Sequence, residues 1–138
     1  MKPAVIVDTN VVVAGLPVSG NALPVAAILR QMLSGELPFV ASLPLLAEYR
    51  EVLGRPPLKA LHGLAEDAMQ ALLGRIEERA EVIAPAVSAP APDPGDQMLW
   101  NLLAARADLV LVTADKLLLR DRAMRGRVVT PQVFLALA

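Results

Sequence analysis

Five short, mostly apolar runs rich in β-branched residues recur along the chain, each bounded by turn-forming residues. They are apolar at consecutive positions rather than at alternating ones. This pattern is typical of parallel strands that helices cover on both faces of a sheet. The predicted strands are Ala4–Val7, Pro38–Ala41, Glu81–Ala84, Leu109–Val112 and Arg127–Val129.

Segments with helical spacing of apolar residues separate these strands. The alternation predicts right-handed βαβ units, and therefore an α/β fold built as a three-layer α/β/α sandwich with a central parallel sheet. The predicted helices are one capped by Asn21 and running to Leu33, one capped by Ser42, Ala65–Ala80, Asp96–Ala107, Lys116–Met124 and one from Pro131.

Length and composition fit one domain. The chain has 138 residues, within the usual range of about 100–200 for one domain, so residues 1–138 are expected to form a single unit. The sequence has no cysteine, which excludes disulfides, a thiolate nucleophile and a cysteine zinc site. Its net charge of −1 gives no overall basic field for nucleic acid.

The mean hydropathy of +0.50 raises the question of a membrane segment. Glycine and proline break the longest uncharged run, Thr9–Leu29, into pieces far shorter than the roughly 20 apolar residues of a span. The run Ala4–Val7 is too short for the core of a signal peptide. The sequence therefore predicts no membrane segment and a cytoplasmic location.

Acidic residues follow several of the predicted strands. Asp8 comes directly after the first strand, and Asp115 lies just beyond the fourth. Glu48 lies in the second turn of the helix after the second strand, and Asp93 and Asp96 precede the helix after the third. Ligands of open parallel sheets bind at the carboxyl ends of the strands. We therefore expect these five side chains at one edge of the sheet.

Helical spacing distinguishes some of these acids from solvent-facing charges. Asp96 heads the apolar stripe that continues through Leu99 and Leu103, and Glu48 borders the stripe of its own helix. Glu51 is rotated further toward solvent. Asp96 and Glu48 can thus lean toward the protein interior.

Helix capping is the competing interpretation of the same acids. Asp93 followed by Pro94 suits an N-cap, and Asp96 can stabilise that helix through its dipole. Asp115 can cap the next helix, and Asp8 can bracket a turn. Each residue alone leaves both interpretations open, but independent caps have no reason to converge on one edge.

Several carboxylates crowded together repel one another unless a cation compensates them. Oxygen ligands without histidine or cysteine select Mg²⁺ or Mn²⁺, which can support hydrolysis of a phosphodiester. The only histidine, His62, is expected in an exposed loop. Lys116 and Arg50, each near one of the acids, can meet phosphate groups.

Two apolar features have structural interpretations. Trp100 is expected in the core. The closing segment Val133–Ala138 either packs against the sheet or forms an oligomer interface.

Four segments resemble, in order, the motifs of PIN-domain ribonucleases, and most closely the toxins of bacterial type II toxin–antitoxin pairs. The similarity covers nearly the whole chain. The segments are Val5–Val13 (VIVDTNVVV), Leu45–Leu53 (LLAEYREVL), Asp93–Leu99 (DPGDQML) and Leu111–Leu118 (LVTADKLL).

The resemblance implies an endoribonuclease that acts on RNA with Mg²⁺ or Mn²⁺. It also implies a homodimer and, for a toxin, a small antitoxin protein as partner. Asn10 and Thr113 match positions that support the site, and Asp93 competes with Asp96 for the third acidic position. The acids implied to bind metal and activate water are Asp8, Glu48, Asp96 and Asp115.

This sequence departs from the family pattern at three positions. Gly95 and Gln97 stand where relatives often carry further acids, which leaves fewer carboxylates for a second metal ion. Ala114 replaces a frequent glycine.

Three other classes of protein compete with a ribonuclease. A receiver-like phosphoacceptor domain with an acidic Mg²⁺ pocket fits poorly, because the middle strand ends at Ser42 without an adjacent aspartate. An Asp-x-Asp phosphohydrolase fails because Asn10 occupies the second position. A noncatalytic α/β binding module stays open as the alternative to an enzyme.

Overall fold

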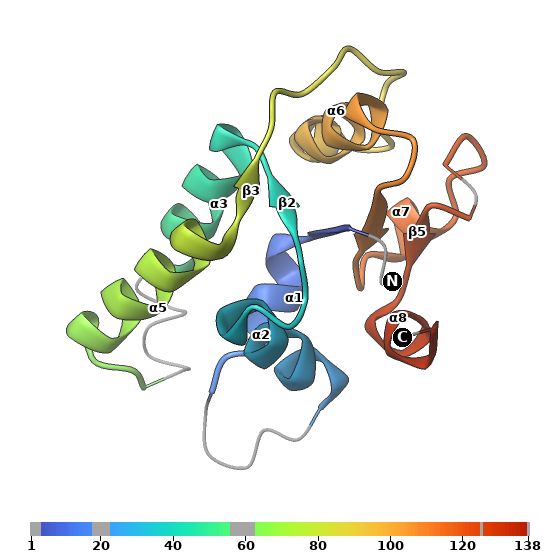
Figure 1. The fold of residues 1–138 in the computed structure, drawn as a ribbon. Helices are drawn as coiled ribbons and strands as arrows, with labels where there is room; N and C mark the ends of the chain where they lie inside the picture. Colours follow the sequence, from blue (N-terminus) through green and yellow to red (C-terminus); the bar gives the residue numbers. More distant parts are fainter. Residues whose placement is uncertain (1–3, 18–22, 56–62, 125, 138) are drawn as a thin grey trace.

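The structure is a computed structural model that describes residues 4–17, 23–55, 63–124 and 126–137 (Figure 1). Its elements, in chain order, are β1 (Val5–Val7), α1 (Thr9–Ala14), α2 (Pro24–Ser34), β2 (Val40–Ala41), α3 (Leu43–Leu53), α5 (Glu66–Arg79), β3 (Glu81–Val82), the 3-10 turn η1 (Pro94–Asp96), α6 (Gln97–Ala105), β4 (Val110–Val112), α7 (Lys116–Leu119), β5 (Val128–Val129) and α8 (Pro131–Leu137).

The strands pair in parallel throughout. β1 pairs with β4, and β4 pairs with β5. β2 pairs with β3, and a parallel bridge between Val5 and Phe39 sets this second pair beside β1. The strand order is therefore β3-β2-β1-β4-β5, with the carboxyl ends of the strands at one edge. The predicted parallel sheet is confirmed.

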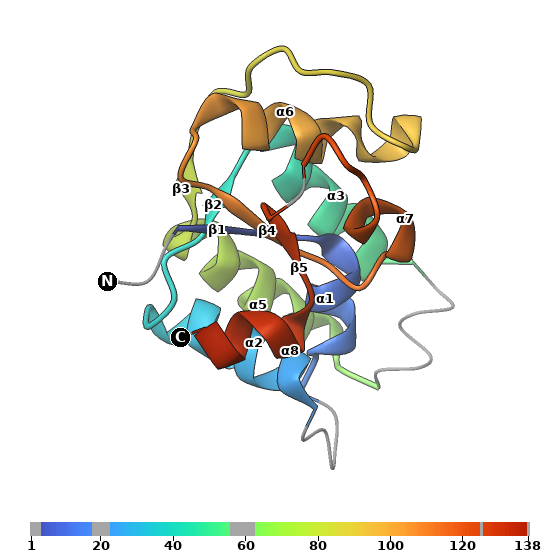
Figure 2. The ribbon, with the colours of Figure 1, turned by 90° about the vertical axis from the view of Figure 1, so that its right-hand side faces the viewer.

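Helices cover both faces of this sheet. α6 packs against β1 and β4 on one face, whereas α1, α2, α5 and α8 lie on the other side of the strands (Figure 2). β1 is buried along its whole length, and Trp100 of α6 is also fully buried. The predicted three-layer α/β/α sandwich and the core position of Trp100 are confirmed.

Each strand is shorter than its apolar run predicts. The run Glu81–Ala84 gives a strand of only Glu81–Val82, and both of its residues are exposed. β3 lies at the edge of the sheet and pairs with β2 alone, so ladder hydrogen bonds hold it on one side only. The burial that consecutive apolar residues predict is found in the central strand β1 and is absent from the edge strand β3.

The helices differ from the predicted ones mainly at their ends. α2 begins at Pro24 with Leu23 at the N-cap, and the expected cap, Asn21, lies outside the described residues. The helix expected from Asp96 begins at Gln97, because residues 94–96 form a 3-10 turn. The helix expected to reach Met124 ends at Leu119.

The helix α1 was not predicted, because its sequence contains three consecutive valines, which favour strands. It forms here because burial outweighs that preference. Val11 and Val12 are buried against the core at 1% and 0% exposure. This helix begins directly after Asp8 and thereby carries Thr9 and Asn10 at the carboxyl edge of the sheet.

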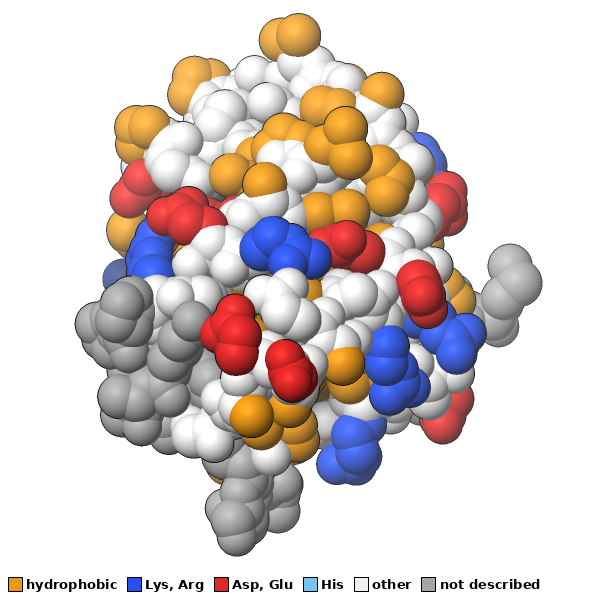
Figure 3. Space-filling model, turned by 90° about the vertical axis from the view of Figure 1, so that its left-hand side faces the viewer, with side chains coloured by type: hydrophobic (Ala, Val, Ile, Leu, Met, Phe, Trp, Pro, Cys, Tyr) orange, Lys and Arg blue, Asp and Glu red, His pale blue; other side chains and the backbone are white. Residues whose placement is uncertain are grey.

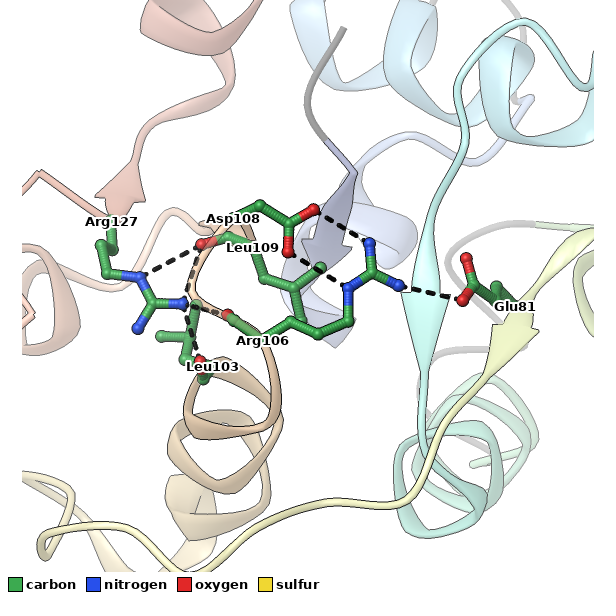
Figure 4. Close-up of polar contacts among 6 residues, drawn as sticks. All are labelled: Glu81, Leu103, Arg106, Asp108, Leu109 and Arg127. Atoms are coloured by element: carbon green, nitrogen blue, oxygen red, sulfur yellow. Dashed lines mark hydrogen bonds and ion pairs between the residues drawn. The ribbon is translucent and has the colours of Figure 1, made fainter.

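Arg127 holds α6 to the start of β4 at the opposite edge of the sheet (Figure 4). Its guanidinium group donates to the carbonyl oxygens of Leu103 and Arg106 at 2.7 Å and to that of Leu109 at 3.2 Å. These carbonyls belong to the end of α6 and the loop after it, where no further helical N–H reaches them. The neighbouring Arg106 instead forms exposed ion pairs with Asp108 and Glu81.

The C-terminal segment packs inward in part. Phe134 is buried and α8 contacts α2, so this residue belongs to the core of its own chain rather than to a free interface. Val133 and Leu137 remain exposed at 48% and 74%. In the part of the chain that the structure describes, no helix is both long enough and apolar enough to cross a membrane.

Candidate active site

Asp8 lies at the carboxyl end of β1 and is only 6% exposed. Its backbone N–H donates to the carbonyl oxygen of Val112 at 3.0 Å, which extends the β1–β4 ladder by one residue. Its side chain accepts from the Thr113 hydroxyl at 2.7 Å and from the Asn10 amide at 3.3 Å, both at Oδ2. Asp8 occupies the N-cap position of α1, but its side chain makes no capping hydrogen bond there.

Thr113 and Asn10 connect the ends of β1 and β4. The Thr113 hydroxyl oxygen accepts from the backbone N–H of Asp115 at 3.0 Å, while the Asn10 side chain accepts from that of Ala114 at 3.4 Å. Thr113 is itself fully buried. The two residues that the sequence matched to supporting positions therefore lie beside Asp8 and fix the loop that carries Asp115.

Glu48 reaches the same edge from α3. Ser42 caps this helix by accepting from the backbone N–H of Leu45 at 3.3 Å, which sets where the helix begins. The Glu48 carboxylate is half-buried and accepts a hydrogen bond from the Thr9 hydroxyl. Glu51 is exposed, as the helical spacing predicts, and it pairs with Arg55.

The other three acids differ in whether their side chains cap a helix. They are Asp93, Asp96 and Asp115. Asp93 caps the 3-10 turn by accepting from Gly95 N–H at 2.8 Å, and Asp115 caps α7 by accepting from Leu117 N–H at 2.9 Å. Asp96 is half-buried at the start of α6 and makes no capping hydrogen bond with its side chain. Side-chain caps are thus present at Asp93 and at Asp115. Asp96 makes no such bond but lies in the first turn, where the helix dipole can stabilise it.

The acids at this edge interact electrostatically. Burial raises the pKa of Asp8, and repulsion by Glu48 and Asp115 adds to this effect, while hydrogen bonds from Thr113 and the Thr9 backbone lower it. For Asp96, partial burial and then repulsion by Asp8, Asp115, Asp93 and Glu48 raise the pKa to about 6. Both shifts favour protonation in the absence of a cation.

The donor set suits a hard divalent cation, because it consists of carboxylate oxygens whose mutual repulsion such an ion relieves. Across the described ranges, however, no group of three or more His, Cys, Asp or Glu side chains is arranged so as to hold a metal ion. The acids nevertheless share one electrostatic environment.

The basic residues expected near the acids take different positions. Arg50 turns away to α5, where it binds Glu77 and Gln70, so it does not reach phosphate beside Glu48 in this arrangement. Charges of both signs are mixed on the face that α3 and α5 cover (Figure 3). Lys116 is exposed at the start of α7, next to Asp115. His62 lies outside the described residues.

Two residues bound to the candidate site were not predicted from the sequence. Tyr49 is fully buried and donates from its hydroxyl to the carbonyl oxygen of Val7, and Thr9 binds Glu48. The only sequence signal was adjacency, since each directly follows a candidate acid.

Gln97 stands at a position where relatives often carry an acid. Its side chain binds the backbone of Ala91 and Ala89 instead.

A family model described as PIN domain matches residues 4–117, which is most of the chain, so this protein belongs to the PIN-domain family. PIN domains are typically nucleases, which act on RNA or other nucleic acids and generally use divalent metals. This membership excludes the receiver-like alternative. No curated protein matches the chain.

Proposed function

We propose that this chain is an endoribonuclease that hydrolyses RNA phosphodiester bonds with Mg²⁺ or Mn²⁺. The acids Asp8, Glu48, Asp96 and Asp115 would hold the ion. The observation that supports this most is the gathering of these acids at the carboxyl edge, where burial and then mutual repulsion raise the pKa of Asp8 and of Asp96, although neither side chain makes a capping hydrogen bond. In this proposal residues 1–138 act as one PIN-like nuclease domain.

The chain's own side chains prepare this site for a cation. Thr113 and Asn10 hold the Asp8 carboxylate in one orientation, and Thr9 does the same for Glu48. A bound Mg²⁺ or Mn²⁺ would polarise the phosphodiester and lower the pKa of water at the site. Asp93 supports the site indirectly, by fixing the turn that carries Asp96.

RNA cleavage by purified protein tests this proposal. We expect cleavage of a single-stranded RNA with Mn²⁺ or Mg²⁺ and none in EDTA. Asp8→Asn and Glu48→Gln should each lower the single-turnover rate by about 100-fold or more. Glu51→Gln is the matched control, because it removes an exposed carboxylate of the same helix and should keep the wild-type rate.

Cleavage that survives EDTA, or that both acidic-site variants retain, would contradict the proposal. A folded wild type that binds the ion but cleaves no RNA would favour the noncatalytic binding module instead.

The biological setting is part of the proposal and rests on the resemblance to toxins. We expect a toxin of a toxin–antitoxin pair, acting on RNA in the cytoplasm, blocked by a small antitoxin protein. A homodimer is expected too, and exposed Val133 and Leu137 on α8 give it an apolar surface. Light scattering at micromolar concentration should then show a dimer that Leu137→Glu weakens.

A further inference from the structure

Two hydrogen bonds join α3 to the residues on either side of Asp8. The Tyr49 hydroxyl donates to the carbonyl oxygen of Val7, and the Thr9 hydroxyl donates to the Glu48 carboxylate. Glu48 and Tyr49 are consecutive in α3, and Val7 and Thr9 are the neighbours of Asp8. The pair of bonds therefore spans two acids of the proposed site that lie 40 positions apart in the sequence (48 − 8).

The carbonyl oxygen of Val7 has no hydrogen-bond donor from the neighbouring strand β2. The N–H of Asp8 points to β4, where it binds Val112, so the carbonyl of the preceding residue faces the β2 side. β1 and β2 share only the bridge between Val5 and Phe39, near the start of β1. A buried carbonyl without a partner is destabilising, and the Tyr49 hydroxyl supplies that partner.

Core packing alone does not explain a tyrosine at this position. Tyr49 is 1% exposed and is surrounded by the apolar core, where phenylalanine would fill almost the same volume. A buried hydroxyl group needs a hydrogen-bond partner, and here that partner is the last carbonyl of β1, one residue before Asp8.

We infer that Tyr49 is a positioning residue that fixes the placement of Asp8 relative to Glu48. Its hydroxyl ties the end of β1 to α3, and the bond from Thr9 to Glu48 orients the second carboxylate against the same segment. This role rests on the proposed function, because it matters for catalysis only where the two acids act on one ion.

Tyr49→Phe tests the inference by removing one oxygen atom. In EDTA we expect amide hydrogen exchange at Asp8 and Thr9 to become about tenfold faster than any change in global stability explains. We also expect Mn²⁺ affinity and the single-turnover cleavage rate to fall about tenfold or more, as when an orienting partner of a metal ligand is removed. The KM for RNA should not change.

Ser42→Ala is the matched control. It also deletes a buried hydroxyl that serves α3, but that hydroxyl accepts from the Leu45 N–H and so caps the helix instead of binding the residues beside Asp8. It should lower stability while leaving local exchange at Asp8 and the Mn²⁺ affinity unchanged. Thr9→Val, which breaks the other bond, should reproduce the loss of Mn²⁺ affinity and serves if Tyr49→Phe does not fold.

Wild-type exchange at Asp8 in Tyr49→Phe would overturn the inference, and so would equal effects of Tyr49→Phe and Ser42→Ala on Mn²⁺ affinity. Failure of the proposed function looks different, because the wild type itself would then neither bind Mn²⁺ nor cleave RNA.

Discussion

Thr113 lies fully buried at the end of β4, where its hydroxyl group serves three polar groups at once. It donates to Asp8, and it accepts from Asn10 at 3.4 Å and from the backbone of Asp115. A hydroxyl can fill all three roles, whereas a methyl group of the same size can fill none. The orientation of Asp8 and of the loop before α7 therefore depends on this one oxygen atom.

We predict that Thr113→Val destabilises the protein by about 1.5–3 kcal/mol near neutral pH, because it deletes a hydrogen bond to a charged group. That bond lowers the pKa of Asp8, so its loss raises this pKa further, and the destabilisation should shrink in acid, where Asp8 is protonated. Urea unfolding in EDTA at neutral and acidic pH measures both effects. The control is Thr130→Val, which removes only a cap of α8, and a pH-independent loss in Thr113→Val would contradict the account.

A second prediction concerns the pH dependence that Asp96 creates in metal-free protein. Its pKa rises from 3.8 to about 6 on folding, so the folded state keeps this proton at pH values where the unfolded chain has lost it. This group therefore makes the free energy of unfolding fall as the pH rises from about 4 to about 6. Asp96→Asn should remove the dependence, and the variant should gain stability relative to the wild type across this window.

Urea unfolding in EDTA at several pH values within that window measures the difference between the two proteins. Asp93→Asn is the control, since asparagine caps about as well as aspartate, and its curve should run parallel to the wild type. If the free energy of unfolding depends on pH in the same way in the wild type and in Asp96→Asn, folding does not raise the pKa of Asp96.

The positions of the candidate acids could be predicted from the sequence better than those of their hydrogen-bond partners. Asp8 and Asp115 could be placed because each follows an apolar strand, and strand ends converge in a parallel sheet. The hydrogen bonds from Thr9 to Glu48 and from Tyr49 to Val7 could not be predicted, because they depend on how closely α3 packs against β1. The direction of Arg50 depends likewise on the position of α5.

At the scale of elements, Arg127 and Arg106 show how differently two neighbouring arginines contribute (Figure 4). Arg127 is half-buried and binds three backbone carbonyls at the end of α6 and in the loop after it, one of which, that of Arg106, also accepts from the Leu109 N–H. Arg106 binds two carboxylates, but these ion pairs are exposed to solvent. Exposed ion pairs add little to the free energy of unfolding, whereas buried carbonyl groups without a hydrogen-bond donor lower it substantially.

We therefore predict that Arg127→Gln lowers the free energy of unfolding by about 2–4 kcal/mol, because it leaves several carbonyl groups with fewer donors. Arg106→Gln should change stability little, although it breaks both ion pairs. Urea unfolding of the two variants at moderate salt makes the comparison. Equal losses would contradict the view that the carbonyl contacts, rather than the charges, join α6 to β4.

Element boundaries could be predicted where a local signal sets them and could not be predicted elsewhere. Ser42 and Asp93 mark N-caps that the structure confirms. The helix α1 contradicts the strand preference of its valines, because burial of Val11 and Val12 outweighs it. Tertiary packing, which the local sequence does not encode, decides such elements.

For the whole molecule, alternation of strands and helices was sufficient to predict the three-layer sandwich. This prediction succeeded because parallel strands need crossovers, and crossovers place helices on the sheet faces whatever the exact strand lengths. The same geometry gathers the strand ends at one edge and so brings acids from β1, α3, η1 and α7 into one electrostatic environment.

The free energy of unfolding with and without Mn²⁺ tests most directly whether these acids form one metal site. We predict that Mn²⁺ at about a hundred times its dissociation constant stabilises the wild type by about 2.7 kcal/mol relative to EDTA. At the same concentration the gain should shrink or vanish in Asp8→Asn, Asp96→Asn and Asp115→Asn, and it should persist in Glu51→Gln. A wild type that gains nothing from Mn²⁺, or acidic-site variants that keep the full gain, would contradict a shared metal site and leave these acids as local structural residues.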